Sequence, residues 1–136
     1  MNPVLTIASL MALAAAQAPS AQAIEGRWIN PSKDVIIAIA PCGGDNLCGK
    51  VEWATPKAQA DARKGIPELI GADLLTGLSA AGDNRWKGRL FVPDQNMRVT
   101  AKLAIAGPDQ LKVSGCAIGG MLCDSQIWTR AGATNP

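Results

Sequence analysis

Apolar and polar residues alternate most clearly over residues 97–105, "MRVTAKLAI". The apolar positions are 97, 99, 101, 103 and 105, and polar side chains occupy most of the positions between them. A period of two is typical of a strand with one face in the core and one in solvent. Turn residues follow at 107–110, and the alternation resumes at Leu111 and Val113. This segment therefore predicts a β-hairpin.

Similar patterns predict further strands along the chain, while helical periodicity is nearly absent. Residues 69–78 are the most ambiguous of these segments, because "LIGADLLTGL" is also compatible with a short helix. The other strands are predicted at residues 27–29, 35–40, 49–54, 84–92 and 125–130. About eight short strands joined by tight turns favour an all-β domain, a small antiparallel barrel or a sandwich.

One long polar connection interrupts this pattern at residues 55–67, "TPKAQADARKGIP". Three interpretations remain open: a solvated loop, a short helix across the end of a barrel, or a lid. The loop is the simplest of the three and is the one expected here. Residues 131–136 are expected to form a flexible tail.

The first 23 residues have the pattern of an export signal. An apolar run from Val4 to Ala16 precedes Ala21-Gln22-Ala23, and the first charged side chain is Glu25. The run is too short to span a bilayer as a helix, and its length suits the core of a signal peptide. We therefore expect residues 1–23 to be a signal peptide cleaved near Ala23, and residues 24–130 to form a single domain in the periplasm or outside the cell.

The charge balance argues against a nucleic-acid partner. The 136 residues contain 13 Lys and Arg and 11 Asp and Glu, a formal net charge of +2. The basic residues are spread singly along the chain, whereas nucleic-acid binding usually requires a concentrated basic patch. No segment after the signal is apolar enough for a membrane span, and a soluble monomer is expected.

Four cysteines form two close pairs, Cys42 with Cys48 and Cys116 with Cys123. In an oxidising compartment an even number of cysteines favours disulfides. The spacings differ from the short knuckles of common zinc sites and from the C-x-x-C redox motif, although zinc and redox functions stay open as alternatives. A Gly-Gly pair between each two cysteines favours the local pairing Cys42–Cys48 and Cys116–Cys123 over a crossed one.

Several motifs in this order resemble a bacterial family of small exported proteins, domain-of-unknown-function family 2147. They are "GRW" at 26–28, "CGKVEW" at 48–53, "NRWKGRLFVPD" at 84–94 and "LKVSGCAIGG…QIWTR" at 111–130. The resemblance implies a lipocalin-like up-and-down β-barrel with no assigned activity. It also suggests the arrangement of calycins, in which an early G-x-W packs against a late Arg at the closed end. Trp28 and Arg130 match those positions and are expected to be structural.

Catalytic residues are scarce. The chain contains no His and no Tyr, and its cysteines are expected to be paired. Most arrangements of nucleophile and base therefore cannot be assembled, and the carboxylates lie mostly in turns or beside basic residues. We expect no enzymatic activity, no cofactor and no metal site.

Four tryptophans, at positions 28, 53, 86 and 128, are the most informative side chains that remain. They are interpreted first as core residues, although one or two could line an open barrel mouth. Two functions follow. The favoured one is a binding barrel for a small hydrophobic ligand, and the alternative is an envelope protein with a filled core and a partner-binding surface. The residues predicted to line the ligand site are Val51, Trp53, Trp86, Leu90, Val99 and Leu103.

Overall fold

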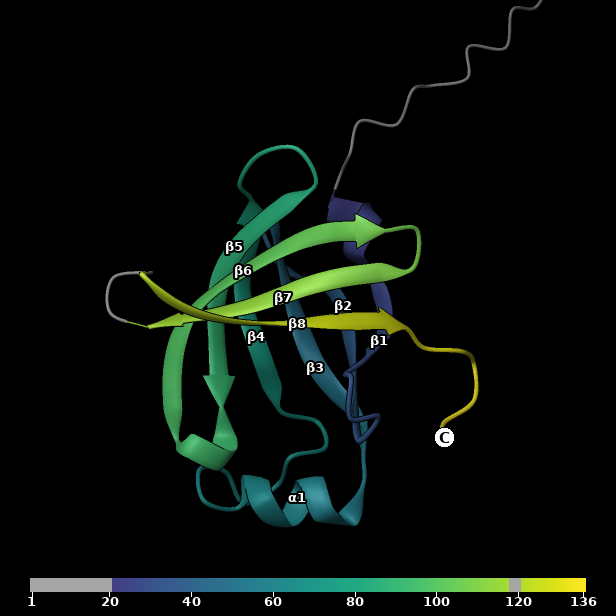
Figure 1. Ribbon diagram of the computed structural model, residues 1–136, viewed down its shortest axis with the longest axis vertical. Helices are drawn as coiled ribbons and strands as arrows, with labels where there is room; N and C mark the ends of the chain where they lie inside the picture. Colours follow the sequence, from purple (N-terminus) through teal and green to yellow (C-terminus); the bar gives the residue numbers. More distant parts are fainter. Residues whose placement is uncertain (1–20, 118–120) are drawn as a thin grey trace, which may run out of the picture.

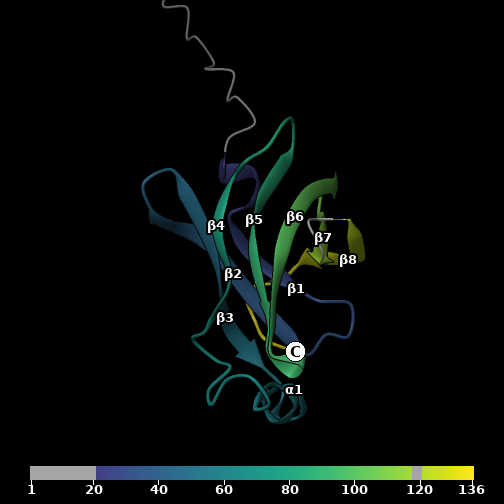
Figure 2. The ribbon, with the colours of Figure 1, turned by 90° about the vertical axis from the view of Figure 1, so that its left-hand side faces the viewer.

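Eight antiparallel strands close into a barrel in which every strand pairs with its neighbours in sequence (Figures 1 and 2). The computed structural model describes residues 21–117 and 121–136, so most of the predicted signal peptide lies outside the described residues. The strands are β1 (Gly26–Ile29), β2 (Val35–Gly43), β3 (Asn46–Ala54), β4 (Asp73–Ala80), β5 (Arg85–Val92), β6 (Met97–Gly107), β7 (Gln110–Ala117) and β8 (Leu122–Arg130). The predicted up-and-down β-barrel is confirmed, and the ambiguous segment 69–78 contributes to strand β4.

The apolar positions that alternate in the sequence of β5, β6 and β7 face the interior of the barrel. Trp86, Leu103 and Val113 are cross-strand neighbours on β5, β6 and β7, and all three are buried in the core. The adjacent pair Lys87 and Lys102 is exposed on the opposite face. Because successive side chains of a strand point to opposite faces, this register puts the apolar set inside the barrel.

One end of the barrel, called here the Trp28 end, is closed by an aromatic plug. The 3-10 helix η1 (Ala21–Ile24) lies at this end (Figure 1), and the Trp28 indole donates a hydrogen bond of 2.9 Å to the Ile24 carbonyl. Trp28 is fully buried, and the Arg130 guanidinium lies 4.0 Å from the centre of its ring. Arg130 also donates to the carbonyls of Ala23 and Glu25. The pairing of Trp28 with Arg130 joins β1 to β8 and completes the barrel.

A helix lies across the opposite end, called here the α1 end (Figures 1 and 2). Helix α1 (Pro56–Ala62) begins at Thr55, whose side chain accepts a hydrogen bond from the Ala58 amide, and Pro56 occupies its first turn. Ala58 and Ala62 are buried against the core. The expectation of a loop over 55–67 was therefore wrong for residues 56–62, because an N-cap, an N-terminal proline and two core-facing alanines favour a helix there.

Helix α1 and the segment after it pack against the short 3-10 helix η2 (Pro93–Gln95), which joins β5 to β6. A Cβ atom at Gly65 would collide with the Pro93 carbonyl. The absence of a side chain at Gly65 thus allows these two connections to pack together beneath the barrel.

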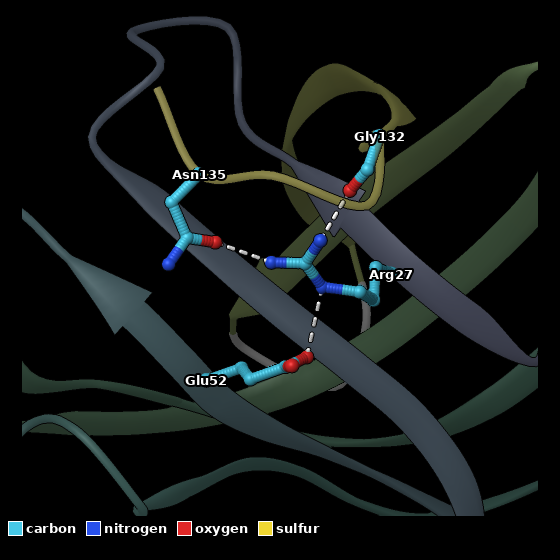
Figure 3. Close-up of polar contacts among 4 residues, drawn as sticks. All are labelled: Arg27, Glu52, Gly132 and Asn135. Atoms are coloured by element: carbon cyan, nitrogen blue, oxygen red, sulfur yellow. Dashed lines mark hydrogen bonds and ion pairs between the residues drawn. The ribbon is translucent and has the colours of Figure 1, made fainter.

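The C-terminal residues fold back over β1. The half-buried Arg27 side chain donates to the Gly132 carbonyl and to Asn135 Oδ1, and its Nε lies 3.1 Å from Glu52 Oε2 on β3 (Figure 3). One arginine thus links β3, β1 and the segment after β8 on the outside of the barrel.

Two β-hairpins are each cross-linked by a disulfide. Cys42–Cys48 joins β2 to β3 beside their turn, and Cys116–Cys123 joins β7 to β8. This is the local pairing, and among the described residues no cysteine is free. Two disulfides in a chain of this size are typical of an oxidising, extracytoplasmic compartment.

Candidate functional site

A cavity of about 640 Å³ opens at the α1 end of the barrel. Its walls come from β2, from strands β4 to β8, from η2, and from the connection between β1 and β2. The apolar part of the lining consists of Val35, Ile37, Leu74, Leu75, Leu90, Phe91, Val92, Pro93, Met97, Val99, Val113, Gly115, Ala117, Leu122 and Trp128. A cavity of this size suits a ligand of modest molecular weight.

A glycine at an inward position lets two lining side chains pack closely in this wall. Leu90 and Val99 are paired across β5 and β6, and Gly115 on β7 lies beside them. A Cβ atom at Gly115 would approach Val99 Cγ2 to 3.2 Å and Leu90 Cδ2 to 3.3 Å. At the Trp28 end the same strands instead carry Trp86 and Leu103, which are buried in the core. The barrel is therefore filled at one end and hollow at the other.

The polar part of the lining is acidic or neutral. It consists of Asn30, Asp94, Gln95, Asp124 and Gln126. Among the residues that the structure describes, no Lys or Arg lines the cavity. The four residues other than Asn30 are exposed, so they mark the mouth of the cavity rather than its depth. The Trp128 indole donates to Gln126 Oε1 at 3.1 Å, which orients the ring at this mouth.

The six residues predicted to bind a ligand fall in three places. Leu90 and Val99 line the cavity. Val51, Trp86 and Leu103 are almost completely buried in the core and do not line it. Trp53 neither lines the cavity nor belongs to the core cluster. The register of β2 and β3 shifts at a bulge between Ile36 and Ile37, and this shift pairs Trp53 with Ile36. A bulge moves the following side chains to the other face of a strand, which a strict two-residue pattern does not reveal.

Sequence reasoning missed the contribution of β8. Leu122, Asp124, Gln126 and Trp128 occupy alternate positions of this strand and all line the cavity. Their mixture of polar and apolar side chains departs from the apolar inward face of β6. An inward face that carries Asp and Gln is a signal for an open, wet side of a barrel, and it was available in the sequence.

The acidic side chains in the lining of this cavity are Asp94 and Asp124. Among residues 21–117 and 121–136, no three His, Cys, Asp or Glu side chains come close enough together to hold a metal ion. Within the described part of the chain, the pKa values that depart from their ordinary values belong to Lys57 and Asp61, on the exposed surface of α1. Their mutual hydrogen bond raises the pKa of Lys57 and lowers the pKa of Asp61. None of the helices in the described part of the chain is long and apolar enough to cross a membrane.

Comparison with known proteins identifies the fold and the family. No curated protein matches the chain. Among solved structures, it is similar to protein HP1028 from the human pathogen Helicobacter pylori, which belongs to the lipocalin family. The two are 12% identical, the match covers 80% of this chain and 83% of that one, and the TM-score is 0.62. At this identity the similarity shows a common lipocalin-like fold. Residues 26–130 match the bacterial family described as "Uncharacterized protein conserved in bacteria (DUF2147)", and the chain belongs to that family.

Proposed function

We propose that this protein is an exported, non-enzymatic barrel that binds a small, mainly apolar molecule in the cavity at the α1 end. The observation that carries the proposal is the cavity itself, because apolar side chains from β5 to β8 surround about 640 Å³ of space. An unfilled apolar space of this volume loses packing contacts, and a ligand would restore them. The fold is compatible with this function, since eight-stranded barrels can hold one small ligand.

The polar rim narrows the class of ligand. Asp94 and Asp124 contribute carboxylates to the lining. No Lys or Arg among the lining residues that the structure describes balances their negative charge. A ligand with a carboxylate or sulfonate head would meet like charge without a partner. The proposed ligand therefore has an apolar body and a neutral or cationic polar group.

Two fluorescent probes with the same aromatic body test this proposal. 1-N-phenylnaphthylamine is neutral, and 1-anilinonaphthalene-8-sulfonate carries an additional sulfonate. We expect the neutral probe to bind with one site per chain and more tightly than the sulfonate. Native mass spectrometry of protein purified without denaturation complements the titration, because a reproducible extra mass that leaves on unfolding would identify the natural ligand.

A matched pair of variants locates the binding site. Val99→Trp extends a large ring into the cavity, whereas Thr100→Trp adds the same ring at the next position, which faces away from the cavity. We expect the first variant to lose binding of the neutral probe and the second to retain it. Equal binding by both folded variants, or no binding by the unmodified protein, would refute the proposed function.

The alternative is an envelope protein that binds a partner through its surface. It is favoured by Met121 and Leu122, which are 83% and 63% exposed at the start of β8. Exposed apolar side chains of this kind are common at protein interfaces. A bare monomer mass from every preparation, together with no probe binding, would favour this second function.

Export through a signal peptide is part of the proposal. Cleavage after Ala23 would leave 113 residues beginning at Ile24. It would also remove the carbonyl of Ala23, which accepts a hydrogen bond of 2.8 Å from Arg130. The intact mass of the protein from the periplasm or the medium distinguishes this cleavage site from an earlier one that retains the interaction.

A further inference from the structure

The basic residues that are dispersed in the sequence are gathered on one outer face of the barrel. Strands β5, β6 and β7 contain six Lys and Arg and no Asp or Glu. We call this set the cationic face, and its members are Arg85, Lys87, Arg89, Arg98, Lys102 and Lys112. All six are exposed.

The strand register explains how they come together. Lys87 pairs directly with Lys102, and Arg85 and Lys112 flank Ala104 on either side. In an antiparallel sheet, paired residues point to the same face, here the face opposite to Trp86 and Leu103. The odd positions of β5 and the even positions of β6 and β7 therefore form one charged surface.

The charge distribution of the whole chain is correspondingly uneven. The remaining seven Lys and Arg are outnumbered by eleven Asp and Glu, so the rest of the chain has a formal charge of −4 against +6 on the cationic face. The net charge of +2 hides this separation. A one-sided field of this kind orients a protein toward an oppositely charged surface.

Ion pairs do not account for the arrangement, although Arg98 also stacks over the Phe91 ring at 4.8 Å. Like charges directly opposite on neighbouring strands destabilise a sheet, and Lys87 and Lys102 are such a pair. Among the described residues the two ion pairs are Arg27–Glu52 and Lys57–Asp61, and neither involves a residue of β5 or β7. The charges of those two strands are thus available to a partner.

The surface between the cations is hollowed. A second cavity, of about 440 Å³, is bordered by Arg85, Lys87, Lys102 and Lys112, together with Ser114. Beside it, the partner of Lys112 on β8 is Ile127, which is 40% exposed. Cations around a recess, with an apolar side chain next to them, match a layer of phosphate head groups above acyl chains.

From these observations we propose that the cationic face docks the protein on a membrane surface rich in anionic phospholipids. The two disulfides favour this partner over a nucleic acid, because an oxidising compartment exposes the protein to lipid head groups rather than to nucleic acid. The proposal is independent of the apolar cavity at the α1 end, since none of the six cations lines that cavity.

Vesicle sedimentation tests the docking. Vesicles of phosphatidylcholine alone are compared with vesicles that also contain one quarter phosphatidylglycerol, at low and at high sodium chloride concentration. We expect binding only to the anionic vesicles, and loss of that binding in high salt, because screening weakens such contacts. No binding of the unmodified protein to anionic vesicles at low salt would refute the proposal.

A pair of triple variants controls for net charge. R85Q/K87Q/K112Q removes three exposed cations from the cationic face, and K50Q/R63Q/K64Q removes two Lys and one Arg from other exposed positions. We expect the first variant to weaken vesicle binding by about tenfold or more and the second by less than about threefold. Circular dichroism checks that both fold. An equal loss in both variants would show that only net charge matters and would overturn the assignment to this face.

Two competitors separate lipid docking from other anion binding. Inorganic phosphate should displace the protein from vesicles no better than sodium chloride of the same ionic strength. Stronger displacement by phosphate would instead indicate a small-anion pocket in the recess. Binding to single-stranded RNA in the absence of any vesicle binding would indicate a nucleic-acid surface. Either result would replace the proposal.

Discussion

The two ends of this barrel use the same strands for different purposes. At the Trp28 end, Trp28 and Ile24 are fully buried, and Arg130 both covers the indole ring and donates to two backbone carbonyls. At the α1 end, Leu90, Val99 and Trp128 are only partly buried and surround an open cavity. One end is closed and tightly packed, whereas the other is less tightly packed and contains the open cavity. Five sets of substitutions test this comparison and the contacts around it.

The largest effect is expected from the aromatic plug. Trp28→Ala should lower the free energy of unfolding by about 3–5 kcal/mol, because it leaves a cavity that the closed end cannot fill. Trp128→Ala should cost less, about 1–2 kcal/mol, since its ring borders an existing space. Urea denaturation of both variants measures the difference. Equal losses would mean that the two ends contribute alike to stability.

Arg130→Met should lower the free energy of unfolding by about 2–3 kcal/mol. It removes the cation–π contact with Trp28 and leaves the Glu25 carbonyl without its donor, and in a chain that retains Ala23 it also removes the hydrogen bond to that carbonyl. The control is Arg27→Met, which removes an exposed network outside the barrel and should cost less than about 1 kcal/mol. A larger effect at Arg27 would contradict the closing role of Arg130.

Each disulfide closes a short loop and should contribute about 2.4 kcal/mol by restricting the unfolded chain. The pair C42A/C48A should therefore lose stability with little change in binding of the neutral probe. The pair C116A/C123A should lose both stability and probe affinity, because Cys123 lines the cavity. Thermal unfolding and probe titration distinguish the two hairpins, and identical binding by both variants would contradict this difference.

The cap of helix α1 should have a smaller effect. Thr55→Ala removes the hydrogen bond to the Ala58 amide and should cost about 1 kcal/mol of stability. Thr55→Ser retains the hydroxyl and should be close to neutral. Hydrogen exchange at the amides of α1 measures the local opening, which should increase in the alanine variant alone.

The smallest effect concerns the exposed pair Lys57 and Asp61. Because the pKa of Asp61 is lowered in the folded protein, its contribution is present near neutral pH and is lost as the pH falls through the folded pKa. The raised pKa of Lys57 gives the opposite dependence, so that contribution is lost as the pH rises through the folded pKa. In Asp61→Asn, the free energy of unfolding should depend slightly less on pH in the acid range, and probe binding should not change. Urea denaturation at a series of pH values measures this dependence.

The closed end of the barrel was easier to predict from the sequence than the hollow end. Alternation located the hairpin of β6 and β7, since burying one face of a strand requires a period of two. Apolar runs bounded by turn residues indicated the other strands, with residues 69–78 also compatible with a helix. The match of Trp28 and Arg130 to a known motif placed the plug. The cavity was harder to predict, because its walls depend on which inward residues face each other across the barrel. Gly115, for example, packs closely against Leu90 and Val99, and these residues are distant in sequence.

By itself, the sequence determined the strand pattern and favoured the local cysteine pairs, which are consequences of short-range periodicity and spacing. The contact of Trp28 with Arg130 was expected from the resemblance to a known motif. The tertiary structure alone decided where the barrel is hollow, why the bulge in β2 and β3 keeps Trp53 out of the cavity, and how six scattered cations become one face. The physical reason is that cavity shape and surface charge depend on the register between strands, and register joins residues that are remote along the chain.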